Sequence, residues 1–314
     1  MNIIHVGSLS TGKDSQATIL LMINRVGKEN CRFVMADTGN EDAAVFAHLA
    51  YLEETLGIKV DILKADFSEQ IANKRMFIAR DQRNGRRNGK RIRWTNKAKR
   101  RALAVLYPSG NPFLDLCMWK GRFPSRRAQF CTTELKTTPM VEYQMALMDQ
   151  GYGVISWQGI RRDESEKRKN ATLFEKVSRQ LRIFRPIILW TAQQTVDYCH
   201  SQGTEVNPLY SEGFDRVGCM PCINCGKKEI SNIDLRRHGE IERLADWEKL
   251  VGLASKRGES TYFPNPIRDH GKGKHGIFEM VEWSKTTHGG RQMDLLQETE
   301  SNACSSSFGL CDRA

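Results

Sequence analysis

The 314-residue chain lacks any apolar run of the roughly 18 residues that a membrane-spanning helix requires. Its N-terminus also lacks the basic and then apolar segments of a secretory signal, so we expect a soluble, cytoplasmic protein without a membrane partner. Negative charge is in short supply, because 37 Asp and Glu stand against 48 Lys and Arg and leave a formal net charge of +11. That excess says nothing about the fold, but it favours phosphorylated or polyanionic partners.

The first turn of the chain lacks two common phosphate-binding fingerprints. An apolar segment at 3–8 runs into small and hydroxyl residues, and apolar residues from 17 to 26 then recur with helical spacing, which predicts strand, turn and helix. The turn contains no GxGxxG, and the Walker pattern GxxxxGK[ST] fails because Asp14 follows Lys13. The turn still suits an anion, since small residues admit a phosphate and the N–H groups at a helix start favour negative charge.

Acidic residues are almost absent from residues 74–101, where thirteen Lys and Arg are accompanied by Asp81 alone. We predict a solvated basic insertion at about 74–110 that builds no core of its own. Trp94 among these cations suits phosphate contacts together with base stacking, so nucleic acid is one candidate partner of 74–101. A charged loop that merely keeps the protein soluble fits the same composition.

Strands and helices alternate through residues 1–215, with strands expected at 31–39, 59–65, 154–160 and 182–189. This alternation predicts an open parallel α/β sheet whose ligand lies at the carboxyl ends of the strands, where the phosphate turn also lies. Asp37, Thr38, Gly39, Gly159 and Arg161 follow such ends. Residues 216–314 are expected to form a cysteine-rich helical region, with one helix over 233–251.

Cysteine, by contrast, is plentiful, and nine thiols in a cytosolic chain indicate metal or redox chemistry rather than a disulfide framework. Spacing of three residues can direct several thiolates at one centre, although a CxxC also fits a dithiol redox pair. The predicted ligands of a [4Fe–4S] cluster or zinc ion are Cys219, Cys222, Cys304 and Cys311, with Cys131 and then Cys225 as competitors and Cys117 unassigned. Unligated thiols are the alternative.

Six motifs in one colinear order resemble the phosphoadenosine phosphosulfate (PAPS) reductase family, a branch of the adenine nucleotide alpha-hydrolase (PP-loop) superfamily. They are Leu9-Ser10-Thr11-Gly12-Lys13-Asp14-Ser15, Asp37-Thr38-Gly39-x-Glu41, Cys131-Thr132-x-x-Leu135-Lys136-x-x-Pro139, Gly159-x-Arg161-x-x-Glu164-Ser165-x-x-Arg168, Asn207-Pro208-Leu209-Tyr210 and Gly218-Cys219-x-Pro221-Cys222. Three departures stand out: Thr11 replaces a usual Gly, a cysteine pair is reduced to Phe130-Cys131, and the terminal Glu-Cys-Gly-x-His element of the reductases is missing.

The resemblance implies a Rossmann-like (HUP-type) open parallel sheet with helices on both faces and an adenine nucleotide held by its phosphates. The residues expected to bind it are Ser8, Ser10, Thr11, Gly12, Lys13, Asp14, Ser15, Asp37, Thr38, Gly39, Lys136, Gly159 and Arg161.

Two reactions follow from the resemblance. In the first, the Cys311 or Cys304 thiolate attacks the sulfur of PAPS or adenylyl sulfate, AMP or its 3'-phosphate analogue leaves, and an outside thiol releases sulfite. Lys13, Asp14 and Arg161 would assist Cys311.

In the second reaction, ATP and Mg²⁺ near Asp14 adenylate a nucleic-acid or other acceptor, and a sulfur donor then replaces the adenylate. A thiol reductant or a sulfur donor protein is the expected partner in either case. A non-catalytic scaffold that binds zinc and nucleic acid is the third hypothesis.

Overall fold

The computed structural model describes residues 2–264 and 276–286. Its centre is a six-stranded sheet in the order β3-β2-β1-β6-β8-β7, in which every strand is parallel to its neighbours except the edge strand β7. The strands are β1 (Ile3–Ser8), β2 (Cys31–Asp37), β3 (Val60–Lys64), β6 (Gly153–Trp157), β7 (Phe174–Lys176) and β8 (Leu181–Phe184). The predicted open α/β sheet is confirmed, although the strand expected over 182–189 ends before Pro186.

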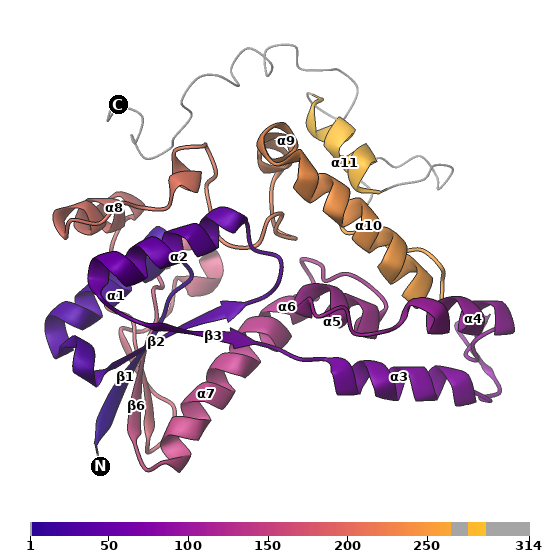
Figure 1. The fold of residues 1–314 in the computed structure, drawn as a ribbon, viewed down its shortest axis with the longest axis horizontal. Helices are drawn as coiled ribbons and strands as arrows, with labels where there is room; N and C mark the ends of the chain where they lie inside the picture. Colours follow the sequence, from indigo (N-terminus) through magenta and orange to yellow (C-terminus); the bar gives the residue numbers. More distant parts are fainter. Residues whose placement is uncertain (1, 265–275, 287–314) are drawn as a thin grey trace.

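Helices cover both faces of this sheet (Figure 1). On one face lie α1 (Lys13–Val26), α2 (Ala43–Leu56) and α8 (Ala192–Ser201), and α1 packs against α8 through Ala17, Leu20 and Val196. On the other lies α7 (Thr138–Asp149), whose Leu147 joins Val6, Val34 and Val154. Because successive side chains of a strand point to opposite faces, β1 contributes to both layers.

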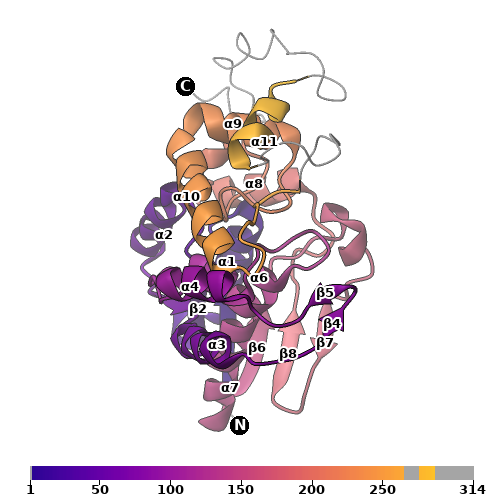
Figure 2. The ribbon, with the colours of Figure 1, turned by 90° about the vertical axis from the view of Figure 1, so that its right-hand side faces the viewer.

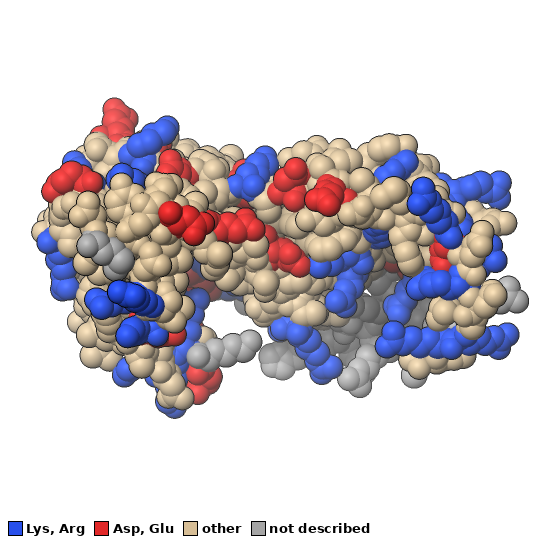
Figure 3. Space-filling model, turned by 90° about the horizontal axis from the view of Figure 1, so that it is seen from below, with Lys and Arg blue, Asp and Glu red and all other residues tan. Residues whose placement is uncertain are grey.

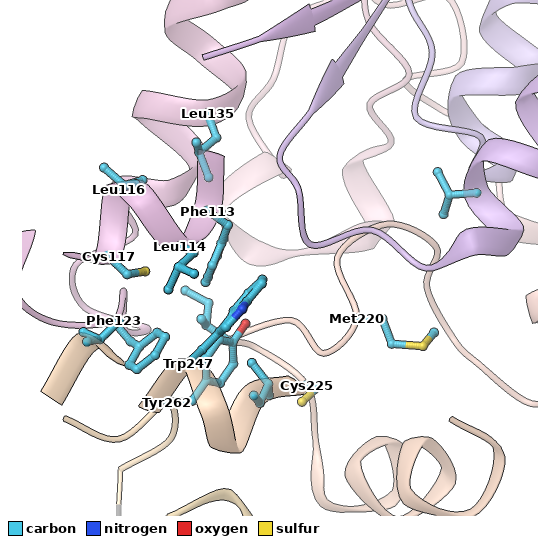
Figure 4. Packing of buried hydrophobic residues seen from close by; sticks show 14 of the residues in the cluster. Phe113, Leu114, Leu116, Cys117, Phe123, Leu135, Met220, Cys225, Trp247 and Tyr262 are labelled. Carbon is cyan, nitrogen blue, oxygen red and sulfur yellow. The ribbon is translucent and has the colours of Figure 1, made fainter. Parts of the chain in front are cut away.

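A helical lobe stands beside the sheet (Figure 1). It consists of α3 (Ser68–Arg80), α4 (Asn96–Val105), α5 (Pro112–Lys120), α9 (Lys227–Arg236), α10 (His238–Ala254) and α11 (Ile277–Ser284). Its centre is aromatic: the ring of Phe113 in α5 stacks on that of Trp247 in α10, with 5.6 Å between the ring centres. Tyr262 lies beside both rings, and Cys117 and Cys225 belong to the same cluster (Figure 4). Helices from the middle and from the C-terminal third of the chain therefore share a single core.

The basic segment is part of this core, which contradicts the prediction of an insertion without one. Ile78, Trp94, Ala98 and Ala102 are buried in the main cluster, and Trp94 is only 7 % exposed. Trp94 is consequently not available to stack on a base. The single helix expected over 233–251 is likewise two helices, because the chain breaks at Arg237, whose guanidinium pairs with Asp42 and Glu212.

No helix among residues 2–264 and 276–286 is long and apolar enough to cross a membrane. The short elements are the hairpin strands β4 (Arg86–Arg87) and β5 (Lys90–Arg91), the turns η1 (Lys28–Asn30), η3 (Arg162–Glu164), η4 (Glu166–Arg168) and η5 (Pro208–Tyr210), and the run α6 (Phe130–Thr132) and η2 (Thr133–Thr137) before α7.

Candidate active site

The phosphate loop joins β1 to α1 and is held in shape by its own hydroxyl groups. The Ser15 hydroxyl donates to the Gly12 carbonyl at 2.9 Å and accepts the Ser10 N–H at 3.1 Å. Thr11 is fully buried with φ +58°, the left-handed region that favours glycine. The chain therefore keeps at Thr11 the backbone shape that the usual glycine provides, and the Asn207 amide donates to the Thr11 hydroxyl at 3.4 Å.

Residues 204–210, far along the chain, contact the phosphate loop and the start of α1. The Tyr210 hydroxyl accepts the Lys13 N–H at 3.1 Å, and the Lys13 ammonium lies 4.9 Å from the centre of the Tyr210 ring. The Gln16 amide donates to the Thr204 hydroxyl and to the Glu205 carbonyl. The sequence marked Asn207 to Tyr210 as a motif but assigned Tyr210 no role, and only the fold reveals its contact with Lys13.

Two cations and a carboxylate meet at the loop. Arg161, which is 4 % exposed, donates through Nε to Asp14 Oδ1 at 2.7 Å and through Nη1 to Asp163. Lys13 Nζ lies 4.0 Å from Asp14 Oδ2. Burial lowers the pKa of the Lys13 ammonium, and the Asp14 charge opposes that shift. Lys13, Asp14 and Arg161 thus form one charged group at the start of α1.

Gly159 brings the end of β6 against the loop. A Cβ at Gly159 would lie 2.6 Å from the Asp14 carbonyl oxygen and 2.9 Å from the Ser15 nitrogen, both backbone atoms. Only glycine admits this approach without moving the loop. The approach also explains how Arg161, two residues later, reaches Asp14.

The turn after β2 lies at the same edge of the sheet. Asp37 accepts the Gly39 N–H at 2.8 Å, and Glu41 accepts from both the N–H and the hydroxyl of Thr38. Glu41 belongs to the second motif but was not predicted to be a site residue. Its carboxylate fixes the turn that presents residues 37–39.

The cysteine turn is attached directly to the β2 turn. The Met220 N–H donates to the Asn40 carbonyl at 2.7 Å, and the Asn40 amide donates to the Pro221 carbonyl at 3.0 Å. The Thr38 hydroxyl lies 3.5 Å from Cys219 Sγ. These contacts place the CxxC sequence beside the edge of the sheet where the phosphate loop lies.

Lys136 lies among the thiols. Cys219 raises the pKa of the Lys136 ammonium most, and Glu41, Cys222 and Cys131 act in the same direction. Burial raises the pKa of the Cys219 and Cys131 thiols, and Lys136 opposes both shifts. Burial thus disfavours the thiolate form of Cys219 and Cys131, and neither has the lowered pKa of an activated nucleophile.

The predicted metal site is only partly within the described residues. Cys131, Cys219 and Cys222 share the surroundings of Lys136, while Cys304 and Cys311 lie outside the described residues. Within 2–264 and 276–286, no three His, Cys, Asp or Glu side chains are arranged to hold a metal ion. The described thiols do not by themselves form the four-thiolate site, which stays a prediction.

His48 gives the support of the loop a dependence on pH. Its Nε2 lies 3.1 Å from Gln16 Oε1, and burial lowers the pKa of His48 to about 4. The unfolded chain protonates this imidazole near pH 6.5, but the folded chain does so only near pH 4. The free energy of unfolding therefore falls as the pH is lowered from 6.5 to 4, by up to about 3 kcal/mol at pH 4. We expect this loss of stability between pH 7 and pH 4, measured by denaturant unfolding, to be absent in His48→Gln. If the variant lost as much stability between pH 7 and pH 4 as the unaltered protein does, the assignment to His48 would be contradicted.

The parallel sheet and the loop at its carboxyl edge define a protein with a nucleotide-binding α/β fold. The profile of the phosphoadenosine phosphosulfate reductase domain matches residues 4–225, and the chain belongs to this family and to the PP-loop superfamily. The recognition made from the motifs is thereby confirmed. All six motifs lie within the matched range.

Among its relatives is an uncharacterized 37.8 kDa protein of Escherichia phage 186, 39 % identical over 98 % of this chain and 97 % of that protein. Adenosine 5'-phosphosulfate reductase of Mycolicibacterium smegmatis is 38 % identical over 27 % of this chain and 35 % of its own length. A solved PAPS reductase of Candida auris aligns with a TM-score of 0.41 and 15 % identity over 71 % of this chain and 83 % of that one.

Proposed function

We propose that the chain is an enzyme that holds an adenine nucleotide on residues 8–15 and transfers its sulfur in a reaction of the PAPS reductase type. The observation that carries the proposal is the meeting of two chemistries at one edge of the sheet. One is the group of Lys13, Asp14 and Arg161 at the loop, and the other is the set of thiols around Lys136. A site that bound only phosphate would not need the thiols.

In the proposed reaction, a thiolate sulfur attacks the sulfate sulfur, the bond from sulfur to the phosphate oxygen breaks, and AMP or 3'-phospho-AMP leaves with the electron pair. A second thiol then attacks the thiosulfonate sulfur that is bound to carbon, which releases sulfite and forms a disulfide. Lys13 and Arg161 would neutralise the leaving phosphate, and Asp14 would orient Arg161.

The nucleophile of this proposal is Cys311, which lies outside the described residues. Burial raises the pKa of Cys219 and Cys131, which favours neither of them for this role. We expect Cys311→Ser to lower sulfite release by at least a thousandfold, because a hydroxyl is a much weaker nucleophile than a thiolate, while nucleotide binding stays within about twofold. Cys31→Ser is the matched control, because Cys31 lies in β2 and donates to the Gly27 carbonyl, as a serine hydroxyl also can. Sulfite release by Cys311→Ser at the unchanged rate would contradict the assignment.

A second reaction uses ATP: an acceptor oxygen attacks the α-phosphorus, pyrophosphate leaves, and sulfur from a donor replaces the adenylate. The helical lobe favours it, because several of its exposed cations have no ion-pair partner among the described residues, and a free sulfonucleotide does not need so extended a positive surface. Mg²⁺ near Asp14 would have to share that carboxylate with Arg161 and Lys13.

The deciding experiment offers PAPS, adenylyl sulfate and ATP separately to anaerobically purified protein with a dithiol reductant. Sulfite and AMP, or 3'-phospho-AMP from PAPS, support the first reaction. Pyrophosphate from ATP, increased by nucleic acid, supports the second and contradicts the first. Absence of all these products, with zinc in the purified protein, would favour the non-catalytic scaffold. Iron, sulfide and zinc analysis of the same sample tests the predicted four-thiolate site.

A further inference from the structure

The surface of the helical lobe carries an extreme imbalance of charge. Between Asp81 and Glu134 the chain has fourteen Lys and Arg and one acid, Asp115. Asp115 is buried and accepts from the N–H and hydroxyl of Ser109 and the N–H of Gly110. Asp81 is buried too, and Arg83 at 2.8 Å holds the pKa of its carboxyl well below the usual range. Neither acid lies on the surface to offset the cations.

Six exposed cations near α3 and α4 have no ion-pair partner within residues 2–264 and 276–286. They are Arg80, Arg86, Arg87, Arg93, Lys97 and Arg100, and we call them the basic surface. Elsewhere on the molecule, exposed cations such as Lys59 and Lys249 have acidic neighbours. Seen from below, the right-hand end that α3 and α4 form carries mainly Lys and Arg, while Asp and Glu gather elsewhere (Figure 3).

A short hairpin carries two of the six cations of the basic surface, Arg86 and Arg87. Arg86 pairs with Arg91 and Arg87 with Lys90 across β4 and β5, and the tip residues Asn88 and Gly89 both have positive φ, as a two-residue hairpin turn requires. Figure 2 shows the hairpin to the right of α3 and α4, at the end of the loops that connect it to them. Its base is fixed, because Arg83 and Lys256 both donate to the Ile92 carbonyl. Because Arg86 and Arg87 are successive residues of β4, the hairpin presents one cation on each of its faces.

The basic surface continues toward the candidate active site. Lys256 contacts the hairpin, its neighbour Ser255 lies against Gly121, and the loop that follows exposes Arg122, Arg126 and Arg127. Arg126 then donates to the Cys225 carbonyl at 3.2 Å. A long anion on the hairpin would thus extend along this loop to the cysteine turn.

The exposed aromatic rings of this region, Phe77 and Tyr107, each already have a guanidinium over one ring face. Trp94 is buried, the Arg83 guanidinium lies 4.7 Å from the centre of the Phe77 ring, and the Arg75 guanidinium lies 3.8 Å from that of Tyr107. Recognition by such a surface rests on phosphate charge rather than on bases.

We propose that the basic surface binds the phosphate backbone of a nucleic-acid duplex without reading its sequence. This proposal rests on the second of the two proposed reactions, in which the nucleic acid would be the acceptor. The binding itself can be measured without any reaction.

The test follows the anisotropy of a labelled DNA duplex of about 20 base pairs between roughly 50 and 200 mM salt. For five or six phosphates neutralised, we expect log Kd to change with log salt with a slope of about 5. The triple variant Arg86→Gln, Arg87→Gln, Arg93→Gln should bind at least tenfold more weakly and reduce the slope by about 2 to 3. The matched control Lys59→Gln, Lys176→Gln, Lys249→Gln has the same net charge and should bind within about twofold of the unaltered protein.

Equal losses in both triple variants would overturn the proposal, because net charge alone would then explain the binding. Displacement of the duplex by polyglutamate at matched charge would also overturn it, in favour of an acidic protein partner. A single strand bound more tightly than the duplex would contradict the backbone-only mode. Nucleotide binding, measured on the same variants, should be unchanged, so failure of this proposal and failure of the proposed function can be distinguished.

Discussion

Replacing Gly159 by alanine is expected to abolish nucleotide binding, with a loss of affinity of at least a hundredfold. The new Cβ would lie 2.6 to 2.9 Å from three backbone atoms of Asp14 and Ser15, and backbone cannot move aside as the end of a flexible side chain can. The phosphate loop must shift instead, which misplaces its N–H groups and separates Asp14 from Arg161. Isothermal titration calorimetry with PAPS and ATP measures the loss.

Gly226→Ala is the matched control, because nothing lies within 4 Å of a Cβ at Gly226 and its φ is −88°. This variant should bind nucleotide as the unaltered protein does. Circular dichroism should show the same helix content for both variants, since the sheet and the lobe are packed independently of the contact at Gly159. Unchanged affinity in Gly159→Ala would show that the nucleotide lies elsewhere.

Arg161→Gln is expected to lower kcat/KM by about a hundred- to a thousandfold. Arg161 is a buried cation beside the loop, and glutamine neither carries its charge nor spans from Asp14 to Asp163. The change also leaves two carboxylates without their common partner, so we expect the free energy of unfolding to fall by about 3 kcal/mol.

Arg179→Gln serves as the control, since Arg179 is exposed in the turn between β7 and β8. It should change neither quantity appreciably. A purely structural role would lower the stability of Arg161→Gln while leaving kcat/KM of the folded fraction unchanged, and that result would contradict its placement in the site.

Much of the sheet domain could be predicted because its periodicity is local. Each of β1, β2 and β3 is a short apolar segment next to a turn, and α1 and α2 show helical spacing over fourteen residues each. The phosphate loop was equally visible, since a strand-to-helix turn of small residues has a physical use that does not depend on the rest of the fold.

The prediction that the basic segment builds no core was wrong, because its many cations outweigh the few apolar residues that mark its buried face. In α4 the only buried residues are Ala98 and Ala102, a narrow stripe among four cations, and Trp94 looked like a surface aromatic. What buries them is α10, from a distant part of the chain, through contacts such as Arg101 to the Ser255 carbonyl. The break at Arg237 has the same origin, because its partners Asp42 and Glu212 are distant in sequence.

Within the candidate active site, the sequence could name residues but could not place them together. Tyr210 contacts Lys13 across 197 positions, and the cysteine turn contacts residues 38–41 across about 180. Such contacts depend on the assembled fold and leave no local signal. The motifs nevertheless included both partners of the pairs Lys13–Tyr210 and Thr38–Cys219.

The central claim is that residues 8–15 hold the phosphates of an adenine nucleotide beside Lys13 and Arg161. The most direct measurement is equilibrium binding of AMP, adenylyl sulfate, PAPS and ATP to the whole chain, with each nucleotide competing against the others. We expect one site per chain, mutual competition among the nucleotides, and loss of all binding in Gly159→Ala but not in Gly226→Ala. Binding that survives in Gly159→Ala, or nucleotides that bind without competing, would contradict it.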